Sequence, residues 1–175
     1  MLKIKTVALG SVLALVLTGC SSGNERLIDR PSPEVEVTAE EFEKEYGFNP
    51  SIPEGVDEVQ YIIDTDTHRG FVGFYEGDVL WNIKVLKTEE FKDIGTPYFY
   101  EGTTEIDCFI DSNQDLTVHG VEPQLNCYMN QYSEDNVDYS AVAMWFIEDD
   151  GLMITLVSLS DEPVHTMPVE VFDSV

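Results

Sequence analysis

Basic side chains are scarce in this chain. Of its 175 residues, 9 are Lys or Arg and 34 are Asp or Glu, so the formal net charge is −25 at pH 7. Nucleic-acid binding draws its strength from Lys and Arg contacts with phosphate, and anionic lipid headgroups repel a strongly acidic protein. The composition therefore excludes nucleic acid as an expected partner and gives no electrostatic route to a membrane surface.

Histidine and cysteine are also rare, with three of each in the chain. The histidines, His68, His119 and His165, lie in or beside predicted turns or prolines, and no Gly-x-Ser-x-Gly segment is present. A nucleophile activated by a histidine therefore has no visible candidate, and there is no CxxC motif or Cys/His cluster that would bind a transition metal. We expect no catalytic residues and a protein that is not an enzyme.

The chain lacks an apolar run long enough to cross a membrane. Residues 6–17 form an uncharged stretch of twelve residues that follows Lys3 and Lys5, whereas a spanning helix needs about 20. A basic start, a short apolar run and small residues after it are typical of a secretory signal peptide. The sequence therefore predicts export.

The junction after this run reads Leu17-Thr18-Gly19-Cys20 and closely resembles the lipobox of bacterial lipoproteins. The resemblance implies that Cys20 receives a diacylglyceryl group and becomes the mature N-terminus, held to the extracytoplasmic face of the cell membrane by its lipid. We expect a signal peptide over 1–19, the lipidated cysteine and a flexible tether over 20–37, and a single acidic domain over 38–175. An ordinary secreted protein with an incidental Cys20 is the alternative.

Two cysteines remain if lipid occupies Cys20. Exported compartments permit disulfides, and the alternation of side chains along a strand turns both Cys108 and Cys127 toward the same apolar face as their neighbours two residues away. We expect a Cys108–Cys127 disulfide. Two buried free thiols that pack as small apolar groups are the alternative.

The residues after the tether predict one helix followed by strands. Thr38 and Glu41 form a capping box, with a helix to Tyr46 and Gly47 as its left-handed cap. Beyond Gly55 the apolar pattern changes to a period of two. Strands are expected over 59–64, 71–75, 79–86, 105–110, 116–118, 121–130, 141–148 and 152–159.

Turns and proline set the remaining expectations. His119-Gly120 and Asp150-Gly151 are predicted hairpin turns, the second of type I′. A helical turn is expected within 88–95, and a C-terminal helix is expected to begin near Ser160 and to be interrupted at Pro168. The fold class expected is α+β: a curled antiparallel sheet of roughly seven or eight strands, built of hairpins, with one or two short helices. The hairpin over 141–159 is apolar on both faces, so we expect it in the middle of the sheet.

Several segments in order carry a second resemblance: Pro-Glu-Gly at 53–55, Thr-Val-His-Gly-Val at 117–121, and the stretches 125–131, 143–154 and 159–162. This order resembles a small domain of unknown function found on Gram-positive lipoproteins and on membrane proteins similar to anti-sigma factors. The resemblance implies an extracytoplasmic α+β module and assigns no catalytic residue.

One polar segment has the spacing of a calcium loop. Oxygen ligands stand at positions 1, 3, 5 and 12 of the stretch 111–122, as Asp111, Asn113, Asp115 and Glu122. Position 6, normally glycine, is Leu116, and strands rather than helices flank the segment. The sequence leaves two interpretations of this segment open, a calcium site and a solvated acidic turn. No other cofactor is expected.

The functional expectation is a non-catalytic, lipid-anchored binding or accessory module of the cell envelope, whose partner is an envelope protein or wall component. Two alternatives remain. The first is a low-affinity, calcium-dependent version of the same module that uses the 111–122 segment. The second is an envelope hydrolase with a carboxylate pair, because acidic side chains are plentiful.

Overall fold

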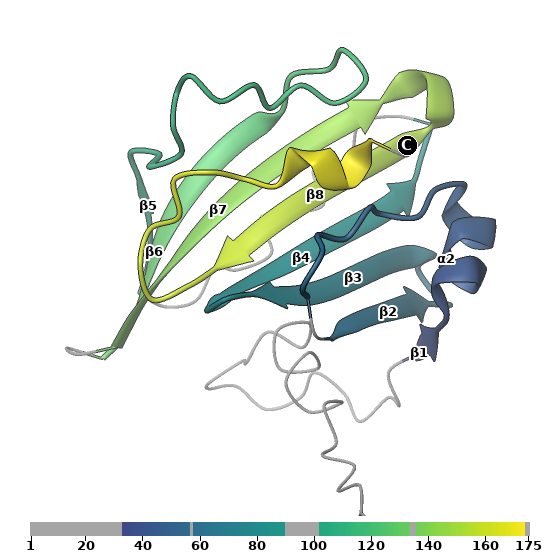
Figure 1. Ribbon diagram of the computed structural model, residues 1–175, viewed down its shortest axis with the longest axis horizontal. Coiled ribbons are helices and arrows are strands. Elements are labelled where there is room, and N and C mark those ends of the chain that lie inside the picture. Colours follow the sequence, from purple (N-terminus) through teal and green to yellow (C-terminus); the bar gives the residue numbers. More distant parts are fainter. Residues whose placement is uncertain (1–32, 57, 90–101, 134–135, 174–175) are drawn as a thin grey trace, which may run out of the picture.

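The architecture is an open, antiparallel, eight-stranded sheet with the strand order β1-β2-β3-β4-β8-β7-β6-β5 (Figure 1). The structure is a computed structural model and describes residues 33–56, 58–89, 102–133 and 136–173. Every strand pairing in it is antiparallel, and the two edge strands, β1 and β5, do not pair with each other.

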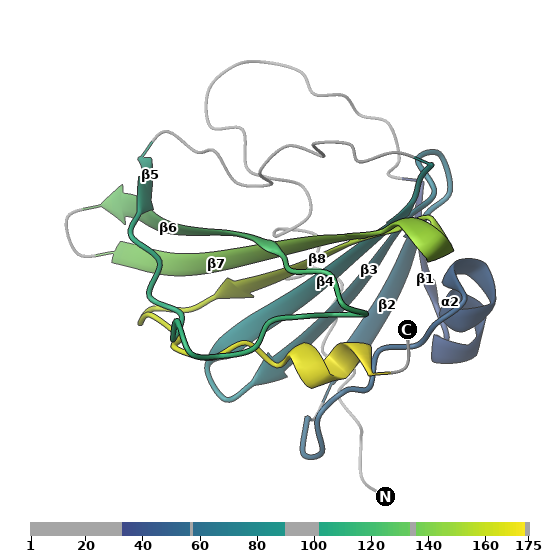
Figure 2. The same ribbon diagram turned by 90° about the horizontal axis from the view of Figure 1, so that it is seen from above.

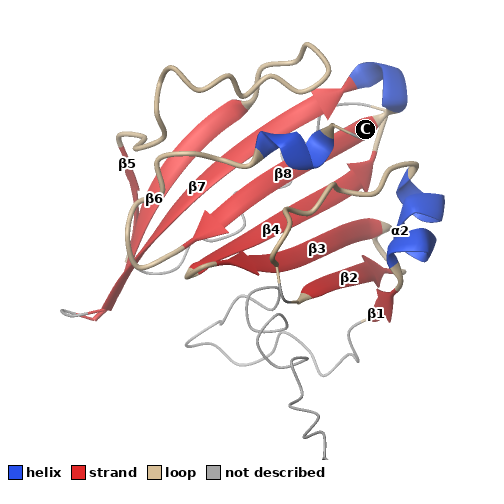
Figure 3. Ribbon diagram, in the orientation of Figure 1, coloured by secondary structure: helices blue, strands red, loops and turns tan. Residues whose placement is uncertain are grey.

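The strands are β1 (Glu34–Val37), β2 (Val59–Asp64), β3 (Arg69–Glu76), β4 (Val79–Lys87), β5 (Thr103–Ile106), β6 (Gln124–Ser133), β7 (Asn136–Ile147) and β8 (Leu152–Leu159). The α-helix is α2 (Ala39–Tyr46), and two short 3₁₀ helices are η1 (Glu148–Asp150) and η2 (Val169–Phe172). The helix lies at the end of the sheet that holds β1, β2 and β3 (Figure 3).

The antiparallel sheet is confirmed, but the fold is mostly β rather than α+β, since α2 is the only α-helix in the four described ranges. The predicted C-terminal helix is absent: the chain is irregular up to Pro168, and only the four-residue η2 follows. Pro163 and Pro168 lack the N–H groups that a helix needs in its interior. Thr88 and Glu89 are not helical, and the rest of the predicted turn over 88–95 lies outside the described residues.

The helix itself forms as its sequence predicts. The Oγ1 of Thr38 accepts a hydrogen bond from the Glu41 N–H at 3.2 Å, and the Glu41 carboxylate accepts one from the Thr38 N–H at 2.9 Å. Gly47 ends the helix with φ +88°. The hydrogen bond from the Thr38 backbone and, after it, the one from the Thr38 hydroxyl to the charged carboxylate lower the pKa of Glu41. Local chemistry alone therefore defines both ends of α2.

The tether predicted to run to Val37 is wrong in its last four residues, because Glu34–Val37 forms β1 and pairs with β2. Val35 pairs with Ile63, and Val37 pairs with Tyr61 and packs against the core. Alternating valines suit a strand, but a four-residue segment beside prolines gave no detectable period. The ordered fold therefore begins before residue 38.

The β7–β8 hairpin lies inside the sheet, as predicted, and its turn differs from the prediction. A type I′ turn needs positive φ at both central residues, yet Gly151 has φ +61° and Asp150 is not among the positive-φ residues. The 3₁₀ helix η1 precedes Gly151 instead. At the other predicted turn, His119 (φ +51°) and Gly120 (φ +77°) both have positive φ. There Val118 and Val121 exchange hydrogen bonds of 3.0 and 2.9 Å, so a tight hairpin turn forms at this site.

One face of the sheet is covered by three of the described segments. Helix α2, the stretch 107–123 and the C-terminal segment 161–173 lie over the same face (Figure 2). They enclose the main core, whose largest fully buried side chains are Trp145, Phe42, Phe74, Phe172 and Ile83. None of the helices in the described ranges is long and apolar enough to cross a membrane.

Candidate functional site

The two cysteines predicted to pair lie side by side. Ile106, the last residue of β5, pairs with Cys127 of β6, and Cys108 follows two residues later. The Cα atoms of Cys108 and Cys127 are 4.9 Å apart and their sulfur atoms are within bonding distance. This geometry fits the predicted disulfide, which would hold the start of the 107–123 stretch against β6.

The predicted calcium ligands occupy local turns. The Asp111 carboxylate accepts hydrogen bonds from the backbone and side-chain nitrogens of Asn113, both at 2.9 Å, and Asp115 accepts one from the Thr117 N–H at 2.9 Å. The Asn113 backbone is the chief cause that lowers the pKa of Asp111, and the Thr117 side chain, followed by its backbone N–H, lowers the pKa of Asp115. Glu122 follows the His119-Gly120 turn.

No group of three or more His, Cys, Asp or Glu side chains that could hold a metal ion occurs among the residues that the structure describes. The three predicted carboxylates of the 111–122 segment are therefore not gathered around one point. Each of the two aspartates is explained as the acceptor of its own turn, and the calcium hypothesis gains no support from this arrangement.

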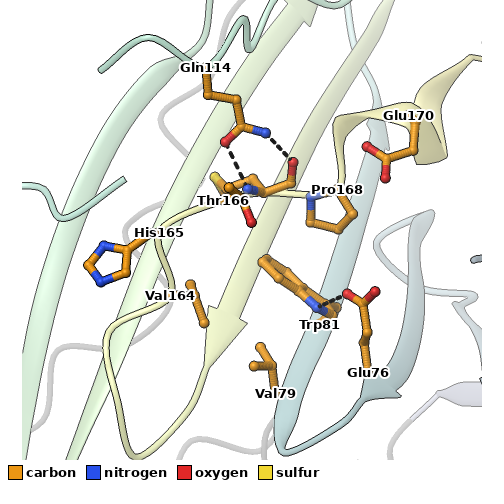
Figure 4. Close-up of a pocket in the computed structure, with 10 residues that line it drawn as sticks. Glu76, Val79, Trp81, Gln114, Val164, His165, Thr166, Pro168 and Glu170 are labelled. Carbon is orange, nitrogen blue, oxygen red and sulfur yellow. Dashed lines mark hydrogen bonds between the residues drawn. The ribbon is translucent and has the colours of Figure 1, made fainter. Parts of the chain in front are cut away.

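A pocket of 480 Å³ lies between the end of the β3–β4 hairpin and the C-terminal segment (Figure 4). This volume falls within the range of small-molecule sites. Its lining comes from three parts of the chain: Glu76, Val79 and Trp81 from the hairpin, Gln114 from the 107–123 stretch, and residues 164–168 with Glu170 from the C-terminal segment.

The hairpin side of the pocket is held by a tryptophan and a glutamate. The Nε1–H of Trp81 donates a hydrogen bond to Oε2 of Glu76 at 3.2 Å. Strand alternation places both side chains on the covered face of the sheet, and Trp81 is buried, with 3% of its surface exposed. The buried indole therefore positions the carboxylate of the exposed Glu76 at the pocket wall.

The opposite side of the pocket is held by Gln114. Its Nε2 donates to the main-chain oxygen of Met167 at 2.6 Å, and its Oε1 accepts from the Met167 N–H at 2.9 Å. Nearby, the Asp111 N–H donates to the His165 oxygen at 2.8 Å, and Nδ1 of His165 lies 2.8 Å from the Phe109 oxygen. These contacts fasten the C-terminal segment to the 107–123 stretch and give the pocket a defined rim.

The charge of the pocket is negative. Glu76 and Glu170 are the carboxylates in its lining, which contains no lysine or arginine. Within the described part of the chain, the Glu170 carboxylate has neither a hydrogen bond nor an ion pair. Figure 4 shows both carboxylates on the same side of the pocket, with His165 on the other side. The arrangement combines apolar side chains with acceptors that a donor or cation would satisfy.

Sequence reasoning did not find this pocket. The sequence places His165 in or beside a turn or proline and Gln114 inside the candidate calcium loop, and neither position indicates a pocket. The pocket depends on contacts between segments that are distant in the chain, and no local sequence pattern predicts these contacts. The one usable indication was an apolar Val79–Trp81 strand that directly follows the Glu76-Gly77-Asp78 turn.

Cys20 and the rest of the predicted lipobox lie outside the described residues. Comparisons with protein-family models, with curated protein sequences and with solved structures find no match for this chain.

Proposed function

We propose that this chain is a lipid-anchored binding module on the extracytoplasmic side of a bacterial cell membrane. The observation that carries the proposal is Leu17-Thr18-Gly19-Cys20, directly after a basic start and a twelve-residue uncharged run. Two or three acyl chains on such a cysteine give stable anchoring, whereas a single chain gives only marginal binding. Anionic lipid headgroups repel a chain of net charge −25, so acyl chains rather than surface charge would hold it to the membrane.

Two structural features support this proposal. The Cys108 and Cys127 side chains lie at disulfide distance, which suits an oxidising compartment. The 480 Å³ pocket, with its apolar side chains and two carboxylates, suits a binding role for the exported domain. The partner in this proposal is an envelope protein or a wall component.

A fractionation experiment tests the anchor. The full chain is expressed in a bacterium with the lipoprotein pathway, and membranes are separated from soluble material. The native chain should sediment with membranes and dissolve only in detergent. Cys20→Ser should move to the soluble fraction, whereas the matched change Ser22→Ala should not. Equal partition of the Cys20→Ser and native chains would overturn the proposal.

The hydrolase alternative is favoured by one observation, the presence of Glu76 and Glu170 in the same pocket. A glycosidase needs its two carboxyl groups to flank the bond that is cleaved, whereas Figure 4 places both on one side of the pocket. The native protein and Glu170→Gln, incubated with purified envelope glycan, separate the two functions. Shortening of the glycan by the native protein alone would establish the hydrolase, and an unchanged glycan favours the binding module.

A further inference from the structure

We propose that the pocket between the β3–β4 hairpin and the C-terminal segment binds an alkylammonium group, as carried by a lysine side chain. This inference deepens the proposed function, because it names the ligand class of the binding module. The first evidence is the negative charge of one pocket wall. Glu76 and Glu170 form this wall, and the lining of the pocket contains no lysine or arginine. A carboxylate is an acceptor only, so the wall is complementary to a donor with positive charge.

The state of the two carboxylates strengthens this assignment. Glu76 accepts the Trp81 indole N–H at 3.2 Å with one oxygen, which fixes its position without neutralising its charge. The Glu170 carboxylate has no hydrogen bond or ion pair in the described ranges. A cation bound beside this wall would be attracted by both carboxylates.

The apolar part of the lining selects among cations. Val79 and Val164, both partly exposed, contribute apolar surface beside the carboxylates, and the buried Trp81 and Pro168 complete this part of the lining. Lysine side chains bury a methylene stem on apolar surface and keep the ammonium at a polar edge. A bare metal ion would gain nothing from this surface, and in the described part of the chain no cluster of metal-ligating side chains occurs. An ammonium on an alkyl chain uses both parts of the pocket.

Hydrogen bonds within the protein hold the rim of the pocket in place. Both polar ends of the Gln114 amide are engaged by Met167, so Gln114 holds the C-terminal segment rather than competing for the ligand. A binding site whose walls are held in place loses less entropy when it is occupied. The acidic charge of the chain as a whole also raises the local concentration of cations at its surface.

The chain contains its own reporter and control for a test. It has two tryptophans: the Trp81 Nε1–H donates to Glu76 in the pocket, whereas the Trp145 Nε1–H donates to the Leu116 oxygen at 2.9 Å. The full mature protein, labelled with ¹⁵N and held in detergent micelles, is titrated with Nα-acetyl-lysine methylamide and, separately, with its uncharged analogue Nα-acetyl-norleucine methylamide. The Trp81→Phe variant assigns the two indole signals.

We expect the lysine probe to shift the Trp81 indole signal saturably and to leave the Trp145 signal in place, while the norleucine probe moves neither. Glu170→Gln should weaken binding about fivefold, and the double change Glu76→Gln and Glu170→Gln should remove the saturable shift. Glu36→Gln, an exposed carboxylate on β1 outside the pocket, should bind within about twofold of the native protein.

A third titration, with 1,5-diaminopentane, distinguishes a free amine from a lysine side chain as the natural source, since both carry the alkylammonium group. Equal responses to the lysine and norleucine probes, no response to any amine, or native affinity in the double variant would overturn the inference. The mass of the N-terminal peptide from the same preparation reports the lipid separately. A failure of ligand binding is therefore distinguishable from a failure of the proposed anchor.

Discussion

Gly70 of β3 lies directly against the ring of Tyr46 of α2. A Cβ atom added to this glycine would come within 2.6 Å of Cε2 of Tyr46 and 2.7 Å of Cε2 of Phe42. Both rings are buried, and their centroids are 4.7 Å apart. The absence of a side chain at Gly70 therefore allows the helix to pack closely on the sheet.

Replacement of Gly70 by alanine should destabilise the protein. Insertion of a methyl group into a packed core costs about 1–3 kcal/mol, so the melting temperature of Gly70→Ala should fall by several degrees. The same change in a Tyr46→Leu background should cost less, because the nearest ring has been removed. A Gly70→Ala protein with the native melting temperature would show that α2 does not pack on β3 in this way.

The stability of the protein should rise as the pH increases from 8 to 10. Burial, with a smaller contribution from the positive charge of Arg69, lowers the pKa of Lys84 from 10.5 to about 8. In this pH window the unfolded chain keeps the Lys84 proton that the folded protein has released, so the free energy of unfolding increases with pH. The slope has an upper limit of about 1.4 kcal/mol per pH unit for one group.

Above pH 10 the slope of the free energy of unfolding against pH changes sign, because burial raises the pKa of Tyr46 to about 12. The unfolded chain then releases the Tyr46 proton first, and stability falls. Urea unfolding at fixed pH values measures both limbs. The Lys84→Met protein should lack the rise between pH 8 and 10 and keep the fall above it. A native protein whose stability is flat from pH 8 to 10 would contradict the assignment to Lys84.

Reduction should lower the melting temperature if Cys108 and Cys127 are bonded. The two residues are 19 apart in the sequence, and closing a loop of this size contributes about 3 kcal/mol in the chain-entropy description. A double Cys108→Ala and Cys127→Ala protein should resemble the reduced native protein and should not respond to reductant. An unchanged melting temperature on reduction would favour the free-thiol alternative.

Loss of the Gln114 amide should loosen the C-terminal segment. Gln114→Ala removes two hydrogen bonds to Met167, each worth about 0.5–1.5 kcal/mol. Hydrogen exchange at the Met167 amide should accelerate about tenfold. Gln124→Ala, at an exposed position on β6, is the matched control and should leave that rate unchanged. Equal exchange rates of the Met167 amide in both variants would show that Gln114 does not hold the C-terminal segment at the rim.

Features with local causes could be predicted from the sequence. The Thr38–Glu41 capping box and Gly47 predicted α2 correctly because both ends depend on contacts within one turn. The ranges of β2 and β8 also matched, since the apolar residues are bounded by turn residues. The central place of the β7–β8 hairpin followed from apolar side chains on both faces.

Features that depend on contacts between distant residues could not be predicted in this way. The strand β1 has only four residues, too few to show a strand period in the sequence. It is stabilised by its pairing with β2. Likewise, the contact between Gln114 and Met167 joins segments 53 residues apart, so the pocket has no local pattern. The polar spacing of the 111–122 segment suggested a calcium loop, because spacing alone does not distinguish metal ligands from aspartates that accept from their own turns.

The mass of the N-terminal peptide tests the account most directly. Trypsin cleaves after Arg26, so a mature chain that begins at Cys20 releases the peptide Cys20-Ser-Ser-Gly-Asn-Glu-Arg26. The account predicts that this peptide, isolated from membranes, carries a diacylglyceryl group on the cysteine sulfur. Recovery of peptides from an uncleaved chain that still begins at Met1, with Cys20 unmodified and the protein in the soluble fraction, would contradict it.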